Sequence, residues 1–211
     1  DYLIQEFKPA IIHTHYLPNA WLVRKLADKH QIPFTVRVHS FDIMINSQER
    51  MQSMMDAINT PLCKQVFTYP EFLKVFEAHG IASEKVQAYW PISNTSLFQP
   101  PVENKEGKKV MCAGPCTAKK AHDRFIDLAY LMRDTGYTFD LYTEGNSIAK
   151  IKKYNAERGN PVNIKYADPE DMPSIYKQHD WLVYPSDTKI NKVGLPVAVI
   201  EAQACGLGVC L

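Results

Sequence analysis

One carboxylate near the end of the chain has the surroundings that most strongly indicate chemistry. Between Val193 and Leu211, Glu201 is the only charged side chain, and its neighbours in the sequence are almost all apolar. Burying a carboxylate without a partner costs several kcal/mol, so Glu201 must either be paired or reach a cleft. A functional carboxylate is therefore one interpretation. The alternative is a core glutamate that is satisfied by a neighbouring backbone group or by a lysine.

The segment around Glu201 is predicted to be a helix between two buried strands. Pro196 suits the first helical position, where a missing N–H costs nothing, and Gly206 suits the C-terminal cap. Residues 181–184 and 209–211 are short and mostly apolar, as buried strands are. Such a strand–loop–helix–strand unit directs backbone N–H groups and a partial positive charge at the loop before Pro196. An anion would be stabilised there.

This stretch, VGLPVAVIEAQACGLGVC, resembles the nucleotide-sugar site of the GT-B glycosyltransferases of the retaining group 1 (family four) type. Those enzymes carry the pattern E-x7-E. Glu201 falls on the second glutamate, whereas Val193 replaces the first, which normally holds a hydroxyl of the donor sugar. Gly194 and Pro196 fall on the glycine and proline between the two glutamates. The resemblance implies that Glu201 accepts hydrogen bonds from the two ribose hydroxyls of the nucleotide.

A second stretch, GPCTAKKA, begins at Gly114 and resembles the phosphate-binding loop GRLxxxKKG of the same enzymes. Lys120 falls on the phosphate-binding lysine, while Pro115 occupies the arginine position and has no N–H to donate. Lys189 or Lys192, just before the predicted helix, could supply the missing positive charge; changing both to alanine should then weaken nucleotide binding. Without the resemblance, Lys120 would be interpreted as an ordinary solvated lysine.

The first half of the chain resembles the family more weakly. In KPAIIHTHY and HQIPFTVRVHSFD, His39 falls on a histidine at a strand end that faces the donor. It could hydrogen-bond the sugar or exchange a proton with the acceptor; a satisfied structural histidine is the alternative. Asp42 is expected to cap the following helix rather than bind the acceptor. His13 and His15 are expected to point to opposite faces of their strand, so that they do not share a metal.

The remaining donor-binding predictions lie next to these motifs. Tyr166 ends a predicted strand at the place where the family's nucleotide base rests. Thr143 replaces the first glycine of the family's G-x-G, where close backbone approach favours glycine. The predicted site comprises His39 and Lys120 as catalytic residues, no metal ligand, and a set of donor-binding residues: Glu201, Gly194, Leu195, Pro196, Val197, Lys192, Lys189, Tyr166 and Gly114.

Short apolar strands alternate with helices along the whole chain. We predict strands at 10–13, 34–39, 66–68, 86–90, 109–114, 139–142, 162–166, 181–184 and 209–211, and helices at 18–30, 42–55, 70–78, 121–133, 147–158 and 169–178 and from residue 196. This alternation predicts an α/β fold with parallel sheets covered on both faces. Two Rossmann-like domains facing a cleft, as in GT-B enzymes, are expected.

The polar, proline-containing stretch at 99–108 is the predicted linker between these domains. Residues 1–98 would then form the acceptor-side domain and residues 109–211 the nucleotide-sugar domain. The resemblance implies that both domains are truncated here. The first would lack its opening strand with a glycine-rich loop, and the second its final strand and the C-terminal helix.

Composition limits the functional classes. The 211 residues carry a net charge of +1 and contain no apolar run near the ~20 residues of a membrane span. Neither nucleic acid nor an integral membrane segment is therefore expected. Five cysteines without framework spacing indicate reduced thiols in a cytoplasmic protein, with peripheral attachment at the inner membrane face left open. Cys112 and Cys116 have no matching pair, which disfavours a zinc site.

The resemblance implies a retaining glycosyltransferase of carbohydrate biosynthesis. It would transfer a sugar from a nucleoside-diphosphate-sugar donor to an unidentified acceptor, which is a glycan, a lipid or a small molecule, without a metal or another cofactor. One alternative is a catalytically silent nucleotide-sugar or glycan-binding module, suggested by Val193 and Pro115. Another is an NAD-linked dehydrogenase, which fits poorly because no G-x-G-x-x-G follows either first strand.

Overall fold

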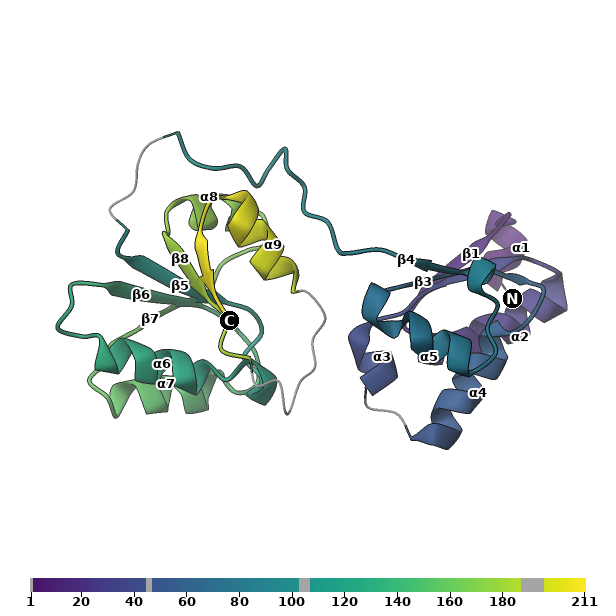
Figure 1. The fold of residues 1–211 in the computed structure, drawn as a ribbon, viewed down its shortest axis with the longest axis horizontal. Helices are drawn as coiled ribbons and strands as arrows, with labels where there is room; N and C mark the ends of the chain where they lie inside the picture. Colours follow the sequence, from purple (N-terminus) through teal and green to yellow (C-terminus); the bar gives the residue numbers. More distant parts are fainter. Residues whose placement is uncertain (1, 45–46, 103–106, 187–195) are drawn as a thin grey trace. The chain divides into compact units, whose positions relative to one another are not determined.

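The computed structural model describes residues 2–44, 47–102, 107–186 and 196–211. The chain forms two compact units, Asp1–Trp90 and Pro91–Leu211, and Figure 1 shows that each consists of a sheet with its own helices. The predicted linker at 99–108 lies inside the second unit. Among the described residues, no helix has the length and apolar character that a membrane crossing requires.

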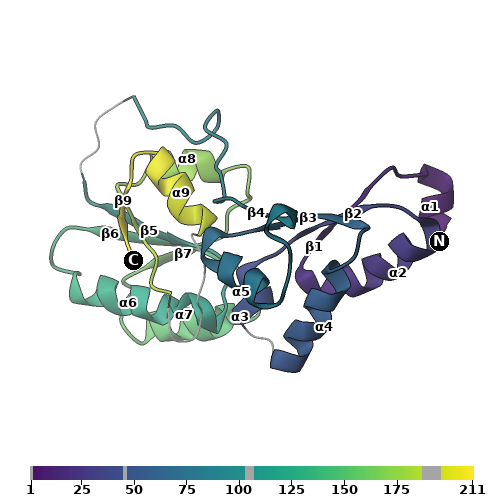
Figure 2. The ribbon, with the colours of Figure 1, turned by 45° about the vertical axis from the view of Figure 1, so that its right-hand side comes forward.

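The first unit is a parallel sheet in the order β1-β2-β3-β4. Ala20, Val23 and Ala27 of α2 recur at helical spacing and pack in one core with Phe34 and Val36 of β2. Figures 1 and 2 both show α2, α4 and α5 on one side of this sheet. The elements are β1 (Ile12–His15), β2 (Phe34–Arg37), β3 (Cys63–Thr68), β4 (Val86–Ala88), α1 (Tyr2–Phe7), α2 (Ala20–His30), α3 (Ser40–Met44), α4 (Gln48–Ile58) and α5 (Leu73–Ala78).

Two helices, α3 and α4, replace the single helix predicted at 42–55. α4 begins at Gln48, because Ser47 has an extended backbone and its hydroxyl accepts the N–H of Arg50 at 3.3 Å. A serine in this position satisfies one of the free donors of the first helical turn. Three methionines of the predicted helix, Met51, Met54 and Met55, are buried in α4, whereas Met44 at the end of α3 is exposed.

Asp42 connects two loops instead of occupying the predicted N-cap position. It is fully buried in the first turn of α3. Its Oδ2 accepts the backbone N–H of His39 and the backbone N–H of Leu17, both at 2.9 Å. The predicted position of the cap is therefore wrong. The carboxylate reaches back from the third helical residue, as the acid of a capping box does, and it joins the loop after β1 to the loop after β2.

The second unit is a parallel sheet with helices on both faces, in the order β7-β6-β5-β8-β9. Figure 1 shows α6 and α7 on one side of it and α8 and α9 on the other. The elements are β5 (Lys109–Ala113), β6 (Thr138–Tyr142), β7 (Asn163–Lys165), β8 (Trp181–Val183), β9 (Gly208–Cys210), α6 (His122–Leu131), α7 (Ile148–Ala156), α8 (Met172–Lys177) and α9 (Val197–Ala204). The predicted α/β fold with two Rossmann-like parallel sheets is confirmed.

The central strand β5 is buried on both faces because alternate side chains point in opposite directions. Met111 and Ala113 belong to one core cluster, together with residues of α8 and α9. Val110 and Cys112 belong to the other, together with residues of α6 and α7. The loop that follows β5 therefore leaves a strand that is fixed by packing on either side.

Helix α9, which carries Glu201, differs slightly from its prediction. It begins at Val197, and Pro196 is the N-cap residue with an extended backbone rather than the first helical residue. Gly206 has a φ of 75°, and the N–H of Leu207 donates to the carbonyl of Ala202 at 2.9 Å. This left-handed glycine closes the helix with a Schellman motif, as glycine commonly does.

Asp140 on β6 is expected to make the stability of the second unit depend on pH. Its carboxylate oxygens lie 3.0 Å from Nε2 of His179, 2.9 Å from Nζ of Lys165 and 3.0 Å from Nδ2 of Asn163. Burial would raise the pKa of Asp140, but these three partners outweigh it, and the pKa lies below its ordinary value. A lowered carboxylate pKa stabilises the native state above the unfolded pKa of about 3.9. That stabilisation is lost as the pH falls through the folded pKa.

The variant Asp140→Asn should therefore unfold more easily than wild type at pH 7, by ~1–3 kcal/mol. The difference should shrink as the pH falls below about 4, because the unfolded chain then takes up the proton first and the native carboxylate takes it up only as the pH falls through its lowered pKa. Urea denaturation at several pH values measures this. The exposed Asp134→Asn variant makes the same change of charge and should leave the unfolding free energy unaltered. Equal stability of Asp140→Asn and wild type at pH 7 would contradict the prediction.

Candidate functional site

Lys120 lies at the carboxyl end of the sheet of the second unit. It ends a short 3-10 turn, Ala118–Lys120, in the loop after β5. Its Nζ donates a hydrogen bond to the hydroxyl of Tyr184 and lies 4.3 Å from the centroid of that ring. A Cβ added to Gly114 would meet Cε of Lys120 at 3.2 Å, and Gly114 has a φ of 138°. Glycine at this position therefore lets the lysine lie across the end of β5.

Hydrogen bonds hold the loop that carries Lys120. Thr143, directly after β6, donates its hydroxyl to the carbonyl of Gly114 at 2.7 Å. The N–H of Cys116 donates to the carbonyl of Glu144 at 2.6 Å. The hydroxyl of Ser186 donates to the carbonyl of Lys119 at 3.4 Å. The substitution of Thr143 for the family's glycine thus adds a tie between two loops.

The charge of Lys120 has no balancing acid among the described residues. Its ammonium is partly buried, and no carboxylate of the described ranges forms an ion pair with it. The adjacent His122 is 2% exposed. Burial, and then the charge of Lys120, lower the pKa of His122 to about 4, although Asp123 opposes the shift. A neutral imidazole adds no positive charge, so the site consists of one ammonium suited to an anion.

Glu201 is half-buried on α9, and its partner is a tyrosine of α8. The hydroxyl of Tyr176 donates a hydrogen bond to the carboxylate. Burial raises the pKa of Glu201, and the Tyr176 hydrogen bond offsets part of that rise. Tyr176 is 1% exposed, and burial followed by the charge of Glu201 raises its own pKa. An ionised carboxylate has several acceptor positions, so one bond from Tyr176 leaves others for a ligand.

The hydrogen-bond partner of Lys120 and the helix that carries Glu201 belong to one core cluster. Tyr184, the partner of Lys120, packs in the same cluster as Tyr176 and as Val199 and Ala202 of α9. Neither tyrosine was predicted from the sequence to be part of the site. A signal was present for Tyr184 alone, because it ends a buried strand at the edge where ligands bind in open α/β sheets.

The other predicted donor-binding residues lie at the start of α9, after β7 or outside the described residues. Pro196 and Val197 begin α9, and Val197 is exposed. Tyr166, which follows β7, is exposed and donates its hydroxyl to Asp168 at 2.8 Å, a bond that raises the pKa of Tyr166. The predicted residues Lys189, Lys192, Gly194 and Leu195, together with Val193, lie outside the described residues.

His39 follows β2 in the first unit and pairs with another histidine. Nε2 of His39 lies 3.1 Å from Nδ1 of His15, and their rings stack with centroids 5.3 Å apart. The ring of Tyr16 lies 4.5 Å from that of His39. Burial lowers the pKa of His39; Asp42 opposes this shift, while Arg37 and His15 add to it. The lowered pKa favours the neutral imidazole of His39, and no side chain among the described residues hydrogen-bonds to its Nδ1.

The expectation that His13 and His15 point to opposite faces is wrong. Their ring centroids lie 5.1 Å apart in an edge-on contact. Side chains alternate along a strand with a period of two, so residues two positions apart share a face. His13 also contacts the hydroxyl of Thr35 at 2.7 Å. Within the described ranges, no group of three or more histidine, cysteine or acidic residues is arranged to hold a metal ion.

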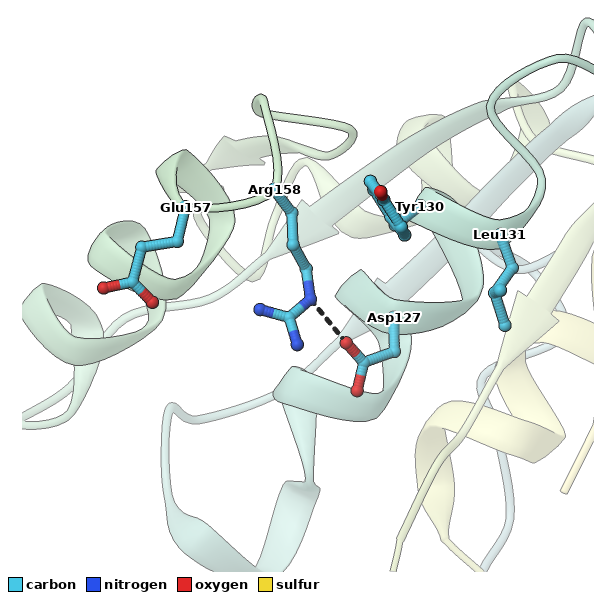
Figure 3. A pocket seen from close by; sticks show the side chains of 5 residues that line it. All are labelled: Asp127, Tyr130, Leu131, Glu157 and Arg158. Atoms are coloured by element: carbon cyan, nitrogen blue, oxygen red, sulfur yellow. Dashed lines mark hydrogen bonds and ion pairs between the residues drawn. The ribbon is translucent and has the colours of Figure 1, made fainter.

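A hollow between α6 and α7 contains charged residues of another kind. Figure 3 shows Arg158 reaching from the end of α7 toward Asp127 of α6, and Nε of the arginine lies 2.6 Å from Oδ1 of the aspartate. Arg158 also contacts the hydroxyl of Tyr154. The lining consists of Asp127, Tyr130, Leu131, Glu157 and Arg158. Because its central charges neutralise each other, we interpret this hollow as a structural contact between the two helices.

Two parallel Rossmann-like sheets of this topology define the GT-B fold, and comparison with solved structures agrees. HepE of Anabaena in complex with UDP-glucose matches with a TM-score of 0.77 and 13% identity, over 99% of this chain and 61% of HepE. TarM of S. aureus matches with a TM-score of 0.74 and 16% identity, over 99% of this chain and 42% of TarM. A glycosyltransferase from Rickettsia africae matches with a TM-score of 0.70 and 16% identity, over 99% of this chain and 59% of that one.

Residues 107–210, which make up most of the second unit, match the family model described as "Glycosyl transferases group 1". This range includes Gly114, Lys120, Tyr184 and Glu201. The chain spans about three fifths of the length of HepE. A search of curated proteins gave no significant match.

Proposed function

We propose that this chain is the core of a glycosyltransferase that moves a sugar from a nucleoside-diphosphate-sugar donor to an acceptor, with retention and without a metal. The observation that carries the proposal is the ammonium of Lys120. It lies at the carboxyl end of the sheet of the group 1 domain, bonded to Tyr184, with no balancing carboxylate among the described residues. Crevices at this edge of parallel sheets are where ligands bind.

The proposed chemistry requires a site that stabilises charge on the departing diphosphate. Preorganised donors and charges supply the largest catalytic term in many enzymes. Lys120 is fixed before the ligand arrives, so it can meet the developing negative charge without reorganising. The N-terminus of α9 adds backbone N–H groups and a partial positive charge. Lys189 and Lys192 remain proposed contributors that would replace the arginine missing at Pro115.

Glu201 is proposed to hold the nucleotide rather than to take part in bond cleavage. A carboxylate accepts hydrogen bonds and can bind two neighbouring ribose hydroxyls at once. The interaction with the Tyr176 hydroxyl favours the ionised form of this carboxylate. Retention is inferred from the resemblance of this segment to the E-x7-E enzymes. UDP is the first nucleotide to test, because HepE was solved with UDP and UDP-glucose and TarM with UDP.

His39 is proposed to contact the donor sugar or the acceptor through Nδ1. His15 occupies Nε2, and a neutral imidazole uses its two nitrogens as one donor and one acceptor. The acceptor, whether a glycan, a lipid or a small molecule, and the cytoplasmic location both remain predictions.

A panel of nucleoside diphosphates tests the proposed function. Thermal unfolding of the chain should shift upward with UDP, or with one other nucleoside diphosphate. A ligand that binds the native state at 100 times its Kd stabilises it by about 2.7 kcal/mol. The corresponding nucleosides, which lack the phosphates, serve as the matched controls and should shift it much less. Absence of any shift across the panel would overturn the proposal.

A catalytically silent binding module is the second candidate, and Pro115 favours it because the residue lacks an N–H where the family has an arginine. Incubation with UDP-glucose separates the two functions. Release of UDP indicates an enzyme. Binding of UDP-glucose without release of UDP indicates a silent module.

A further inference from the structure

We infer that Tyr184 positions Lys120 for the donor diphosphate, an inference that rests on the proposed function. Tyr184 directly follows β8 and is 5% exposed. Its ring packs in the core cluster with Met111 and Leu182. Its backbone N–H donates to the carbonyl of Cys210 at 2.9 Å. The hydroxyl of Tyr184 is therefore a fixed point at the carboxyl end of the sheet.

Lys120 gains its position from this fixed hydroxyl. A lysine ammonium sits at the end of a flexible four-carbon stem and loses considerable rotamer freedom when it is held in one place. The Tyr184 hydroxyl accepts one N–H of the ammonium, and the centroid of the ring lies 4.3 Å from Nζ. On the other side, Gly114 leaves space for the lysine stem. No other group of the described residues accepts a hydrogen bond from this ammonium, so two of its three N–H donors remain for a ligand.

The contact between Tyr184 and Lys120 matters because Pro115 replaces an arginine of the family's phosphate-binding loop. Where the family supplies an arginine, this loop has Pro115, which has no side-chain donor. An ammonium that is already in place when the diphosphate binds avoids the loss of affinity that ordering it later would cause, whether or not Lys189 or Lys192 adds charge. Tyr184 provides that order without adding a carboxylate that would compete with the diphosphate for the ammonium.

The variant Tyr184→Phe tests the inference, because it keeps the packed ring and removes only the hydroxyl. We expect UDP affinity, measured by calorimetry, to fall about tenfold, the lower end for loss of a hydrogen bond to a charged group. The melting temperature without ligand should stay close to that of wild type. Tyr130→Phe, which removes the hydroxyl of an exposed tyrosine on α6, should bind UDP as wild type does.

A double-mutant cycle separates positioning from a merely structural role. If Tyr184 acts through Lys120, Tyr184→Phe should have no further effect on UDP affinity in a Lys120→Ala background. An equal loss in both backgrounds would overturn the positioning role. Unchanged UDP affinity in Tyr184→Phe alone would overturn the inference and leave the proposed function intact. Wild-type protein that binds no nucleoside diphosphate of the panel would overturn both.

Discussion

Replacing Lys120 with alanine is expected to lower the affinity of the chain for UDP by roughly 10- to 100-fold. The ammonium is the charged donor at the end of β5, and hydrogen bonds to charged groups contribute about 1.5–3 kcal/mol each. No carboxylate of the described residues balances this charge, so its removal should not leave a buried acid unpaired. Isothermal calorimetry with UDP measures the effect.

The pKa of His122 is a second measurement, which checks that Lys120→Ala acts at the position of Lys120 in the structure. The charge of Lys120 helps to hold the pKa of His122 at about 4, after the larger effect of burial. Loss of that charge should raise the pKa of His122, which a titration followed by NMR detects. Lys150→Ala removes the same charge from the exposed face of α7 and should alter neither quantity. Undiminished UDP affinity in Lys120→Ala would remove the lysine from the site.

Replacing Glu201 with glutamine is expected to weaken UDP binding by about tenfold or more while leaving the protein at least as stable at pH 7. The amide keeps one acceptor oxygen but loses the charge that strengthens both ribose contacts. Burial raises the pKa of Glu201. A raised carboxylate pKa contributes stability below the unfolded pKa of about 4.3, and this is lost as the pH rises through the folded pKa. The ionised side chain is therefore a cost at neutral pH, which glutamine removes.

Calorimetry with UDP and urea denaturation at pH 5 and pH 8 measure the two halves of this prediction. Glu157→Gln changes an exposed acid at the end of α7 and serves as the control. A binding role predicts lost affinity with retained stability. The opposite result, retained affinity with a large loss of stability, would make Glu201 a core group that serves Tyr176.

Periodicity in the sequence was sufficient to predict the two parallel sheets. Alternating and helical patterns report which side of an element is buried, and the burial of β5 and α2 follows them. The break between α3 and α4 was missed, although five consecutive polar residues, 46–50, interrupt the apolar pattern there and include Ser47, the N-cap of α4. The prediction that His13 and His15 point to opposite faces was wrong because residues two positions apart on a strand share a face. The sequence itself contained the information needed to place them.

The candidate site was predictable only as far as its motifs extend. Lys120 and Gly114 were found because they lie together in one loop, and Glu201 because it stands alone among apolar residues. Their partners Tyr184 and Tyr176 were not found, since each comes from a different element, and a single sequence contains no information on which side chains meet across a sheet. The substitution at Pro115 was visible in the sequence. The contact that we infer to compensate for it was not.

Asp42 has a consequence for attempts to alter this protein. One carboxylate oxygen accepts the N–H of both Leu17 and His39. The segment after β1 and the segment after β2 therefore depend on the same side chain for their positions. Exchanging one segment alone would either remove one of the two N–H donors from the Asp42 oxygen or remove the acceptor on which the other segment depends. Grafts intended to change what the first unit recognises should therefore transplant both segments together with the aspartate, as a single cassette.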